Sequence, residues 1–428
     1  MAPQALGTST ASAGHSQTNI QVSGIDEADT VKTDGKYIYS YQEGERAVVI
    51  LDANTLKSVQ NIRVPESYYD VKIYVQDNTL ILTAARSITY NARWYGWYDN
   101  TQRGIVAIYD MTDRSRVSLE RVIQLDGTIS DSRLDSDGIM TLIGTNYLGV
   151  PPIYYSADAR LATPYTYAAR SLIPNIYDST YSVADGFKTE SRRSLDCTEI
   201  GAVLPDDLST LSDSYYSPAV TTVVRFDTKA SSGALDSKVI FSSNQQIHLS
   251  HDSLYLTTPV YSYGESTCPA GAMCKTIWNP VTSSSTIVHR FAFDGEQTQY
   301  VYSHTIAGSP LDQYSMDEDA SENLRIVTAV DGQTQSTAVT VLNSLGKVVG
   351  TLTNIAPDEN FQSARFIGNR LYLVTFEQID PFFVIDLSNA SSPKILGELK
   401  IPGYSTYLHP YDADRLIGLG YATEENNF

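Results

Sequence analysis

The stretch "DGKYIYSYQEGERAVVILDANTLKSVQNIRV", residues 34–64, decides the fold class. Its turn pair Asp34-Gly35 precedes "YIYSY", which is followed by the apolar run "AVVILD" and by the onward segment "KSVQNIRV". Short apolar or alternating runs that are bounded by Asp, Asn and Gly are typical of strands joined by hairpins. The stretch therefore predicts three consecutive antiparallel strands, and the residues before Asp34 supply a fourth, innermost strand.

The same pattern returns six more times, as "DNTLIL", "DGIMTL", "HDSLYL", "ENLRIV", "GNRLYL" and "DRLIGL". The first apolar positions of the seven copies are Tyr37, Leu80, Met140, Leu254, Leu324, Leu371 and Leu416, and the shortest spacings between them are 43, 45 and 47 residues. A four-stranded repeat of this length is typical of a β-propeller blade, because blades stacked in a ring bury both faces of each sheet. The alternative, a pair of β-sandwiches, does not require so regular a period.

The composition narrows the choice of partners. The chain has 428 residues, 30 of them Tyr, and a formal net charge of −19. A surface of this charge repels phosphate backbones, so nucleic acid is excluded as a partner, and cations or basic surfaces are favoured. The alternative is that the charge only keeps the protein soluble.

The N-terminus and the cysteines indicate the cellular compartment in which the protein resides. Residues 1–18 are small and polar and predict a flexible leader that remains after an export segment is removed, and no run of the sequence predicts a transmembrane segment. Cys268 and Cys274 lie in "CPAGAMC". The Pro and Gly between them suit a tight loop, so we expect a disulfide and an oxidising compartment; two free thiols are the alternative.

Three insertions enlarge modules 2, 3 and 4, at about residues 86–103, 145–217 and 260–285. All three lie between the second and third strands of their module, so we expect them on one face of the ring. They carry the aromatic residues Tyr90, Trp94, Tyr95, Trp97, Tyr98, Tyr154, Tyr155 and Trp278. Aromatic rings with polar groups suit recognition of a protein or a glycan, and the alternative is that these rings pack the long loops onto the ring.

Carboxylates gather where innermost strands begin. Asp26, Glu27 and Asp29 precede the first strand. Asp70 and Asp131 occupy the equivalent part of modules 2 and 3, and Asp317 and Glu318 that of module 5. Innermost strands of a propeller converge on its central channel, so these groups are expected at the channel mouth. Clustered carboxylates repel one another unless they are protonated, solvated or bridged, which makes them candidate ligands for Ca²⁺. The alternative is that they accept N–H bonds between blades or lie in bulk water.

At this point the sequence resembles a known family. The segments "QTNIQVSGIDEADTVKTDGKYIY" (17–39), "QYSMDE" (313–318), "LIGLG" (416–420) and residues 361–412 are similar to those of secreted bacterial and archaeal proteins whose C-terminal β-propeller is distantly related to WD40 repeats. The resemblance spans residues 17–423 and implies export and a propeller over residues 19–428. It implies no established enzymatic activity, so no catalytic residue is carried over.

The sequence thus predicts an all-β propeller of four-stranded blades, with about six complete blades and a partial seventh. Compared with the family the chain ends early, so we expect an open fragment of a seven- or eight-bladed ring, whose seam a neighbouring chain or a C-terminal piece would fill. The alternative is a smaller closed ring whose last blade borrows "TNIQVSG".

Three functions remain open. The first is a non-catalytic, extracellular or cell-surface scaffold that binds a protein or a glycan through the inserted loops. The second is a divalent-cation-dependent hydrolase that uses the channel-mouth carboxylates, although no GxSxG or HExxH motif is present. The third is a structural subunit of a cell-surface layer or filament.

Overall fold

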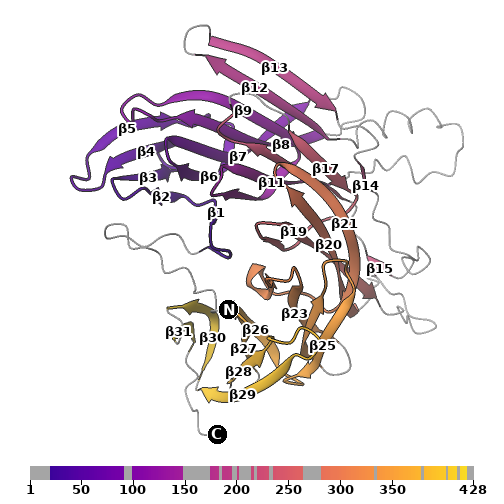
Figure 1. The fold of residues 1–428 in the computed structure, drawn as a ribbon. Helices are drawn as coiled ribbons and strands as arrows, with labels where there is room; N and C mark the ends of the chain where they lie inside the picture. The colour runs from indigo at the N-terminus through magenta and orange to yellow at the C-terminus, as the bar shows by residue number, and fades with distance from the viewer. Residues whose placement is uncertain are drawn as a thin grey trace, which may run out of the picture.

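The computed structural model describes residues 20–90, 99–147, 174–182, 186–194, 200–201, 214–215, 219–230, 235–263, 281–331, 335–376, 380–401, 403–411 and 415–421. In these residues strands form nearly all of the regular structure, and a single 3-10 turn, η5 (Gln313–Ser315), precedes β22. No helix in them is long and apolar enough to span a membrane. The strands form sheets that follow one another around an arc in chain order (Figure 1).

Each sheet of the arc contains a blade of antiparallel strands. Blade 1 is β2 (Val31–Thr33), β3 (Tyr37–Gln42), β4 (Ala47–Asp52) and β5 (Ser58–Arg63). Blade 2 is β6 (Tyr68–Gln76), β7 (Thr79–Tyr90), β8 (Asp99–Asp110) and β9 (Ser118–Asp126). Blade 3 is β10 (Thr128–Asp135), β11 (Ile139–Tyr147), β16 (Ala219–Asp227) and β17 (Asp236–Ile240).

The second half of the arc repeats the arrangement. Blade 4 is β18 (Ile247–Leu249), β19 (Ser253–Tyr263), β20 (Val281–Asp294) and β21 (Gln297–Ala307). Blade 5 is β22 (Met316–Glu318), β23 (Leu324–Val330), β24 (Ser336–Leu342) and β25 (Val348–Ile355). Blade 6 is β26 (Asn360–Ile367), β27 (Arg370–Phe376), β28 (Asp380–Asp386) and β29 (Lys394–Ile401). The last sheet, blade 7, contains only β30 (Tyr404–Pro410) and β31 (Leu416–Tyr421).

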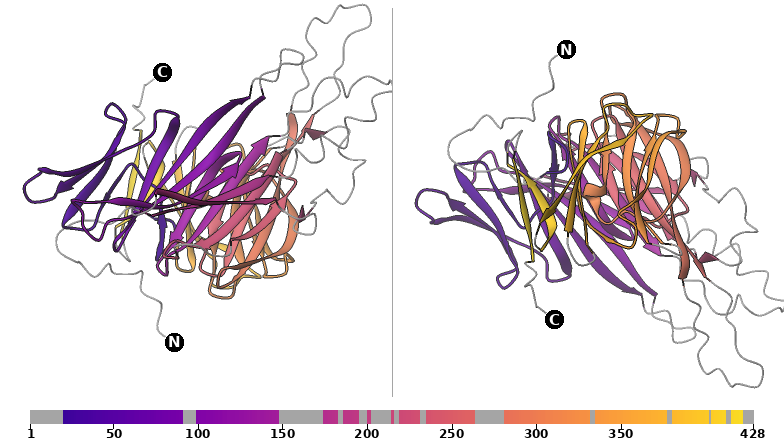
Figure 2. Two further views of the ribbon diagram at one scale, coloured as in Figure 1. Left: turned by 90° about the horizontal axis from the view of Figure 1, so that it is seen from above. Right: turned by 90° about the horizontal axis from the view of Figure 1, so that it is seen from below.

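The predicted repeat is confirmed. Each of the seven first apolar positions lies at or next to the start of the second strand of a blade, as Leu80 does in β7 and Leu371 does in β27. The apolar runs that follow are the third strands, for example "AVVILD" in β4 and "AVTVL" in β24. Figure 2 shows the sheets standing side by side, with their strands running between two opposite faces of the molecule.

Apolar packing between blades holds the arc together. Five clusters of buried residues fill the five successive interfaces from blade 1 to blade 6. The cluster between blades 2 and 3, for example, joins Ile108 and Leu125 to Leu142 and Phe226. Because each face of a blade packs on a neighbour, its central strands are apolar on both faces; the burial pattern of β16 is an unbroken run of buried residues up to Asp227.

The insertion of module 3, at about residues 145–217, adds strands to three blades. β12 (Asn175–Ser182) and β13 (Gly186–Ser194) extend blade 2 beyond β9, with Ile176 opposite Leu125. β14 (Ile200–Gly201) pairs in parallel with β17 of blade 3, and β15 (Ser214–Tyr215) pairs with β19 of blade 4. Part of this insertion therefore lies along the outer edges of blades 2 and 3 and does not project from the ring.

Blades 1 and 7 lie at the two ends of the arc (Figure 1). In the described part of the chain no strand pairing joins the sheet β2–β5 to the sheet β30–β31. The described residues thus show no pairing that closes the arc, and the open ring stays a prediction. The residues of "TNIQVSG" that the structure describes do not pair with blade 7, so the alternative closure is not seen in them.

Candidate functional site

The N-terminal segment Ile20–Asp29, which we call the strap, crosses the inside of the arc. Its short strand β1 (Ile25–Glu27) pairs with β10 of blade 3, with Asp26 opposite Leu134. Further along, the backbone of Asp29 exchanges two hydrogen bonds with Ile73 of blade 2, at 3.2 and 2.7 Å. The strap therefore pairs with two innermost strands, β6 and β10, that come later in the sequence.

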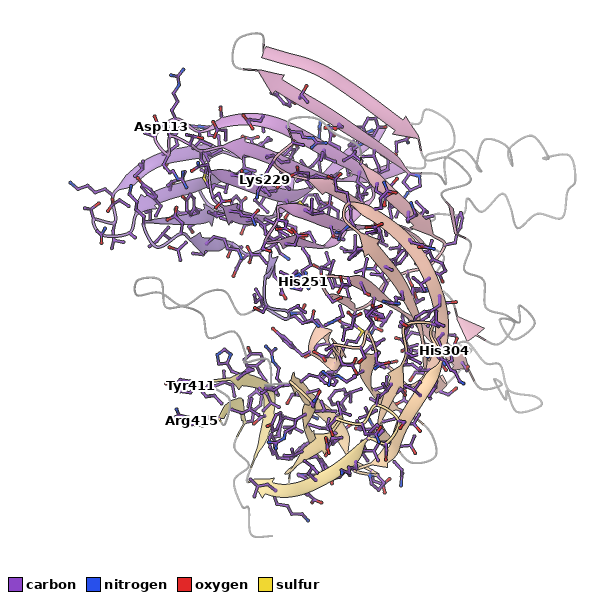
Figure 3. All side chains as sticks on the ribbon, in the orientation of Figure 1. Asp113, Lys229, His251, His304, Tyr411 and Arg415 are labelled. Carbon is purple, nitrogen blue, oxygen red and sulfur yellow. The ribbon has the colours of Figure 1, made fainter. Side chains whose placement is uncertain are left out.

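The other end of the strap reaches blades 4 and 5. The side-chain amide of Gln21 donates to the carbonyl oxygens of Gln313 and Met316. His251, which lies on the inner side of the arc (Figure 3), has its Nε2 atom 3.1 Å from the carbonyl oxygen of Ser23. One segment of ten residues thus contacts blades 2, 3, 4 and 5.

Apolar packing fixes the strap in place. Ile25 is 2% exposed and belongs to the cluster between blades 3 and 4, together with Ile143, Leu249 and Leu254. Full burial of such a side chain contributes about 1.5–3 kcal/mol. The strap is therefore a packed part of the ring interior.

The carboxylates of the strap neutralise cations of the channel wall. Asp26 Oδ1 lies 2.7 Å from Nζ of Lys32, whose side chain is only 6% exposed. Glu27 Oε1 lies 3.9 Å from Arg133 of β10, and the backbone N–H of Gln21 donates to the same oxygen. These pairs explain why acidic residues precede the first strand: they compensate buried positive charge inside the arc.

The predicted acidic residues of blade 5 have partners of their own. Asp317 forms an ion pair with Arg325, which lies opposite it in β23. Burial raises the pKa of Asp317, and Arg325 opposes that shift. Glu318 accepts hydrogen bonds from Ser250 (2.8 Å) and from the hydroxyl of Tyr255 (2.5 Å). Each of these carboxylates thus binds a donor from its own blade or from blade 4.

No group of three or more Asp, Glu, His or Cys side chains in the described ranges is arranged to hold a metal ion. Asp26, Glu27, Asp317 and Glu318 bind Lys, Arg, Ser or Tyr donors, and Asp29 accepts from the backbone N–H of Thr30 at 2.7 Å. The calcium hypothesis stays a prediction, and a fall in melting temperature on chelation would test it.

A polar cavity of about 190 Å³ lies where the strap passes between blades 2 and 3. Its lining includes Glu27, Asp70, Lys72, Asp131, Arg133 and Gln313. Asp70 and Asp131 lie near the starts of the innermost strands β6 and β10. The cavity therefore lies at the predicted channel mouth and brings three of the predicted acidic positions together with two cations.

Charge pairing organises this cavity. Arg133 bonds with Asp131, donates to the carbonyl of Ser132 at 2.9 Å and donates to Gln313 Oε1 at 2.9 Å. Burial raises the pKa of Asp131, and Arg133 opposes the shift. For Arg133 itself burial acts to lower the pKa, but Asp131 and Glu27 outweigh it and the pKa is raised. The cavity holds fixed opposite charges and can offer both donors and acceptors to a ligand.

The three insertions leave the ring on this same face. The last strand pairs before them are Tyr90 with Asp99 in blade 2, Tyr147 with Ala219 in blade 3, and Tyr263 with Val281 in blade 4. In antiparallel blades the connection from the second to the third strand lies at the end where the innermost strand starts. We call this end the inserted face.

Most of the predicted binding residues lie outside the described residues. These are Trp94, Tyr95, Trp97, Tyr98, Tyr154, Tyr155 and Trp278, together with the candidate disulfide Cys268–Cys274 and the leader 1–18. Tyr90 is the last residue of β7, where its backbone pairs with Asp99. The binding and disulfide predictions therefore stay predictions.

A feature that sequence reasoning missed is a belt of polar residues around the channel. Two residues before the position that closes the first hairpin turn, the innermost strands carry Lys32, Tyr74, Arg133, His248, Asp317, Arg365 and His409. Equal register places these side chains on the same face of each blade. Burial, followed by the charges of Arg133 and Arg325, lowers the pKa of His248 to about 3. The belt could have been found by aligning each innermost strand on its hairpin turn.

Comparisons with known proteins agree with this architecture. The chain is 26% identical to an uncharacterised protein of Methanocaldococcus jannaschii and 28% identical to one of Archaeoglobus fulgidus; each match covers 96% of this chain and 66% or 68% of the relative. The chain thus spans about two thirds of the length of these curated relatives.

A solved structure of Pyrococcus horikoshii acylaminoacyl peptidase is also similar, at 11% identity with a TM-score of 0.34 over 92% of this chain and 49% of that one. A likeness this weak carries no argument about function. The family model that matches is the beta propeller domain, over residues 15–428. With its repeated four-stranded sheets and this match across nearly its whole length, the chain belongs to the beta propeller domain family.

Proposed function

We propose that this chain is a non-catalytic, extracytoplasmic scaffold that binds a protein or a glycan at the inserted face. The observation that carries the proposal is the placement of the insertions. Three adjacent blades, 2, 3 and 4, each lengthen the same connection, and those connections leave the ring beside the polar cavity. Loops that a rigid scaffold presents together are where binding residues concentrate in proteins.

The aromatic content of the insertions supports a recognition role. All three tryptophans of the chain, Trp94, Trp97 and Trp278, belong to them. Such rings bury a large area while their polar atoms find hydrogen-bond partners, which suits protein and sugar surfaces. The extracytoplasmic location is supported by the resemblance to secreted proteins and by the "CPAGAMC" segment, which suits an oxidising compartment.

The test removes the insertions without disturbing the strands. Residues 91–98 and 264–280 are replaced by short turns, which the pairs Tyr90–Asp99 and Tyr263–Val281 allow. Binding is measured on a glycan array and by crosslinking to proteins of the cell envelope, and we expect both variants to lose binding while their melting curves stay close to that of the unaltered chain.

A matched control changes the opposite face. Lys36→Gln and Asp113→Asn alter exposed turns at the other end of blades 1 and 2 and should leave binding unchanged. Retained binding in both loop variants would contradict the proposed face. Location is tested separately, by protease accessibility of the protein on intact cells, and a protein found wholly inside the cytoplasm would contradict an extracytoplasmic role.

A further inference from the structure

Arg365 is the belt residue of blade 6, and among the described residues no carboxylate forms an ion pair with it. It lies on β26 opposite Tyr372 and is only 7% exposed. Its Nη1 atom is buried without a hydrogen-bond acceptor. In the ranges that the structure describes, the guanidinium makes neither a hydrogen bond nor an ion pair.

The other cations at this level of the channel are compensated. Lys32 pairs with Asp26 at 2.7 Å, Arg133 pairs with Asp131, and Arg325 pairs with Asp317. Burying an ionised group without a partner costs several kcal/mol, and proteins rarely retain one without a role for it. Among these described cations, Arg365 is therefore the one that lacks a carboxylate partner.

The surroundings of Arg365 suit a bound anion. The Cζ atom lies 4.3 Å from the ring centroid of Tyr314, a cation–π contact that orients the planar group and leaves its N–H edge available. The ring of Tyr407 follows, 6.0 Å from that of Tyr314, and its hydroxyl lies 3.3 Å from Nδ1 of His409. Tyr314, Tyr407 and His409 are partly exposed.

The carboxylate of Asp312 lies near Arg365 but does not serve as its ion-pair partner. Burial raises the pKa of Asp312, and the charge of Arg365 acts in the opposite direction. The Asp312 carboxylate instead accepts from the backbone N–H of Tyr314 at 2.9 Å and from Ser315, where it caps the 3-10 turn η5. Both hydrogen bonds go to Oδ1, which ties this carboxylate to the turn, and among the described residues Asp312 and Arg365 form no ion pair.

We propose that Arg365, with Tyr314, Tyr407 and His409, forms an oxyanion site in the channel, which binds a carboxylate or a phosphate group. A guanidinium presents two parallel N–H donors that match either group, and hydrogen bonds of this charged kind are about twice as strong as neutral ones. The residues of this site come from η5 and from blades 6 and 7 and belong to none of the three insertions, so the site does not depend on the scaffold function proposed above.

The experiment measures binding of simple oxyanions to the whole chain. Isothermal titration is carried out with inorganic phosphate, with glucuronate and with glucose as the neutral counterpart, at one ionic strength maintained with sodium chloride. We expect saturable binding of at least one oxyanion and none of glucose. A response to glucuronate alone assigns a carboxylate ligand, and a response to phosphate alone assigns a phosphate ligand. No saturable binding of either ion would overturn the proposal.

Variants assign the binding to Arg365. Loss of a charged hydrogen bond costs about 1.5–3 kcal/mol, so R365Q should raise the dissociation constant at least about tenfold. R370Q, at the exposed start of β27, is the matched control and should bind as the unaltered chain does. If R365Q fails to fold, R365K carries the test, since an ammonium keeps the charge but cannot form the bidentate pair. A dissociation constant unchanged in R365Q, or in R365K, would overturn the assignment.

Discussion

Replacing Ile25 by alanine is expected to detach the strap from blade 3. Ile25 is 2% exposed and packs between blades 3 and 4, so the substitution removes three buried carbons at about 0.8 kcal/mol each. The cavity that remains adds to this loss, and measured Ile→Ala changes in cores cost about 2–5 kcal/mol. We therefore expect the free energy of opening the β1–β10 pairing to fall by about 3 kcal/mol.

Hydrogen–deuterium exchange with mass spectrometry is the suitable assay, because a chain of many blades need not unfold in one cooperative step. A loss of about 3 kcal/mol corresponds to at least about a hundredfold faster exchange through local opening. The change should be confined to amides of the strap and of β10, with smaller effects in blade 4, whose residues share the cluster of Ile25. Val31→Ala is the matched control, because Val31 is 48% exposed and the substitution should leave exchange nearly unchanged.

Two results would refute this reasoning. Equal exchange of the peptides around Ile25 in both proteins would show that apolar packing does not hold the strap. Uniformly faster exchange in all seven blades would show that the strap is not a local element, and that the ring opens as one unit when the strap is released.

The remaining predictions concern charge and oxidation. Asp26→Asn should destabilise the fold by about 1–3 kcal/mol in urea titration, because the buried Lys32 ammonium loses its carboxylate, and adding Lys32→Met should restore most of the loss. Burial holds the pKa of His248 near 3, so the unfolded chain binds its proton first as pH falls below about 6.5; the stability lost there, up to about 1.4 kcal/mol per pH unit, should diminish in His248→Gln. Cys268 and Cys274 should be disulfide-bonded in exported protein, with reduction costing about 2 kcal/mol or less, and free thiols in unreduced peptides would contradict this.

Most of the fold could be predicted from local patterns in the sequence. The turn pairs identify the second strand of each blade and the apolar runs identify the third strand of blades 1 to 6, because each signal lies within its own strand, as in Tyr37–Gln42 and Ala47–Asp52. The strap was not predicted. "IDE" has no alternation long enough to mark a strand, and its partner β10 lies about a hundred residues away, where only the folded chain brings it close.

The candidate site was predicted in part. Placing the acidic residues at the channel mouth followed from the propeller topology, and the cavity contains Glu27, Asp70 and Asp131 as that reasoning implies. Their partners could not be predicted, because Lys32 and Arg133 carry no signal that distinguishes a buried cation from an exposed one. The edge position of β12 and β13 was also missed, since an alternating segment does not specify which sheet it joins.

The ties of this ring are unevenly distributed, and that has a mechanical consequence. The strap binds blades 2 to 5 from inside, and strands of the insertion at residues 145–217 pair with blades 2, 3 and 4. Blades 6 and 7 have, among the described residues, neither kind of tie and hold mainly to their neighbours. We therefore expect blades 2 to 5 to move as one rigid unit, and blades 6 and 7 to move more easily relative to them. The insertions therefore leave the rigid part of the arc, and Arg365 of blade 6 lies in the more flexible part.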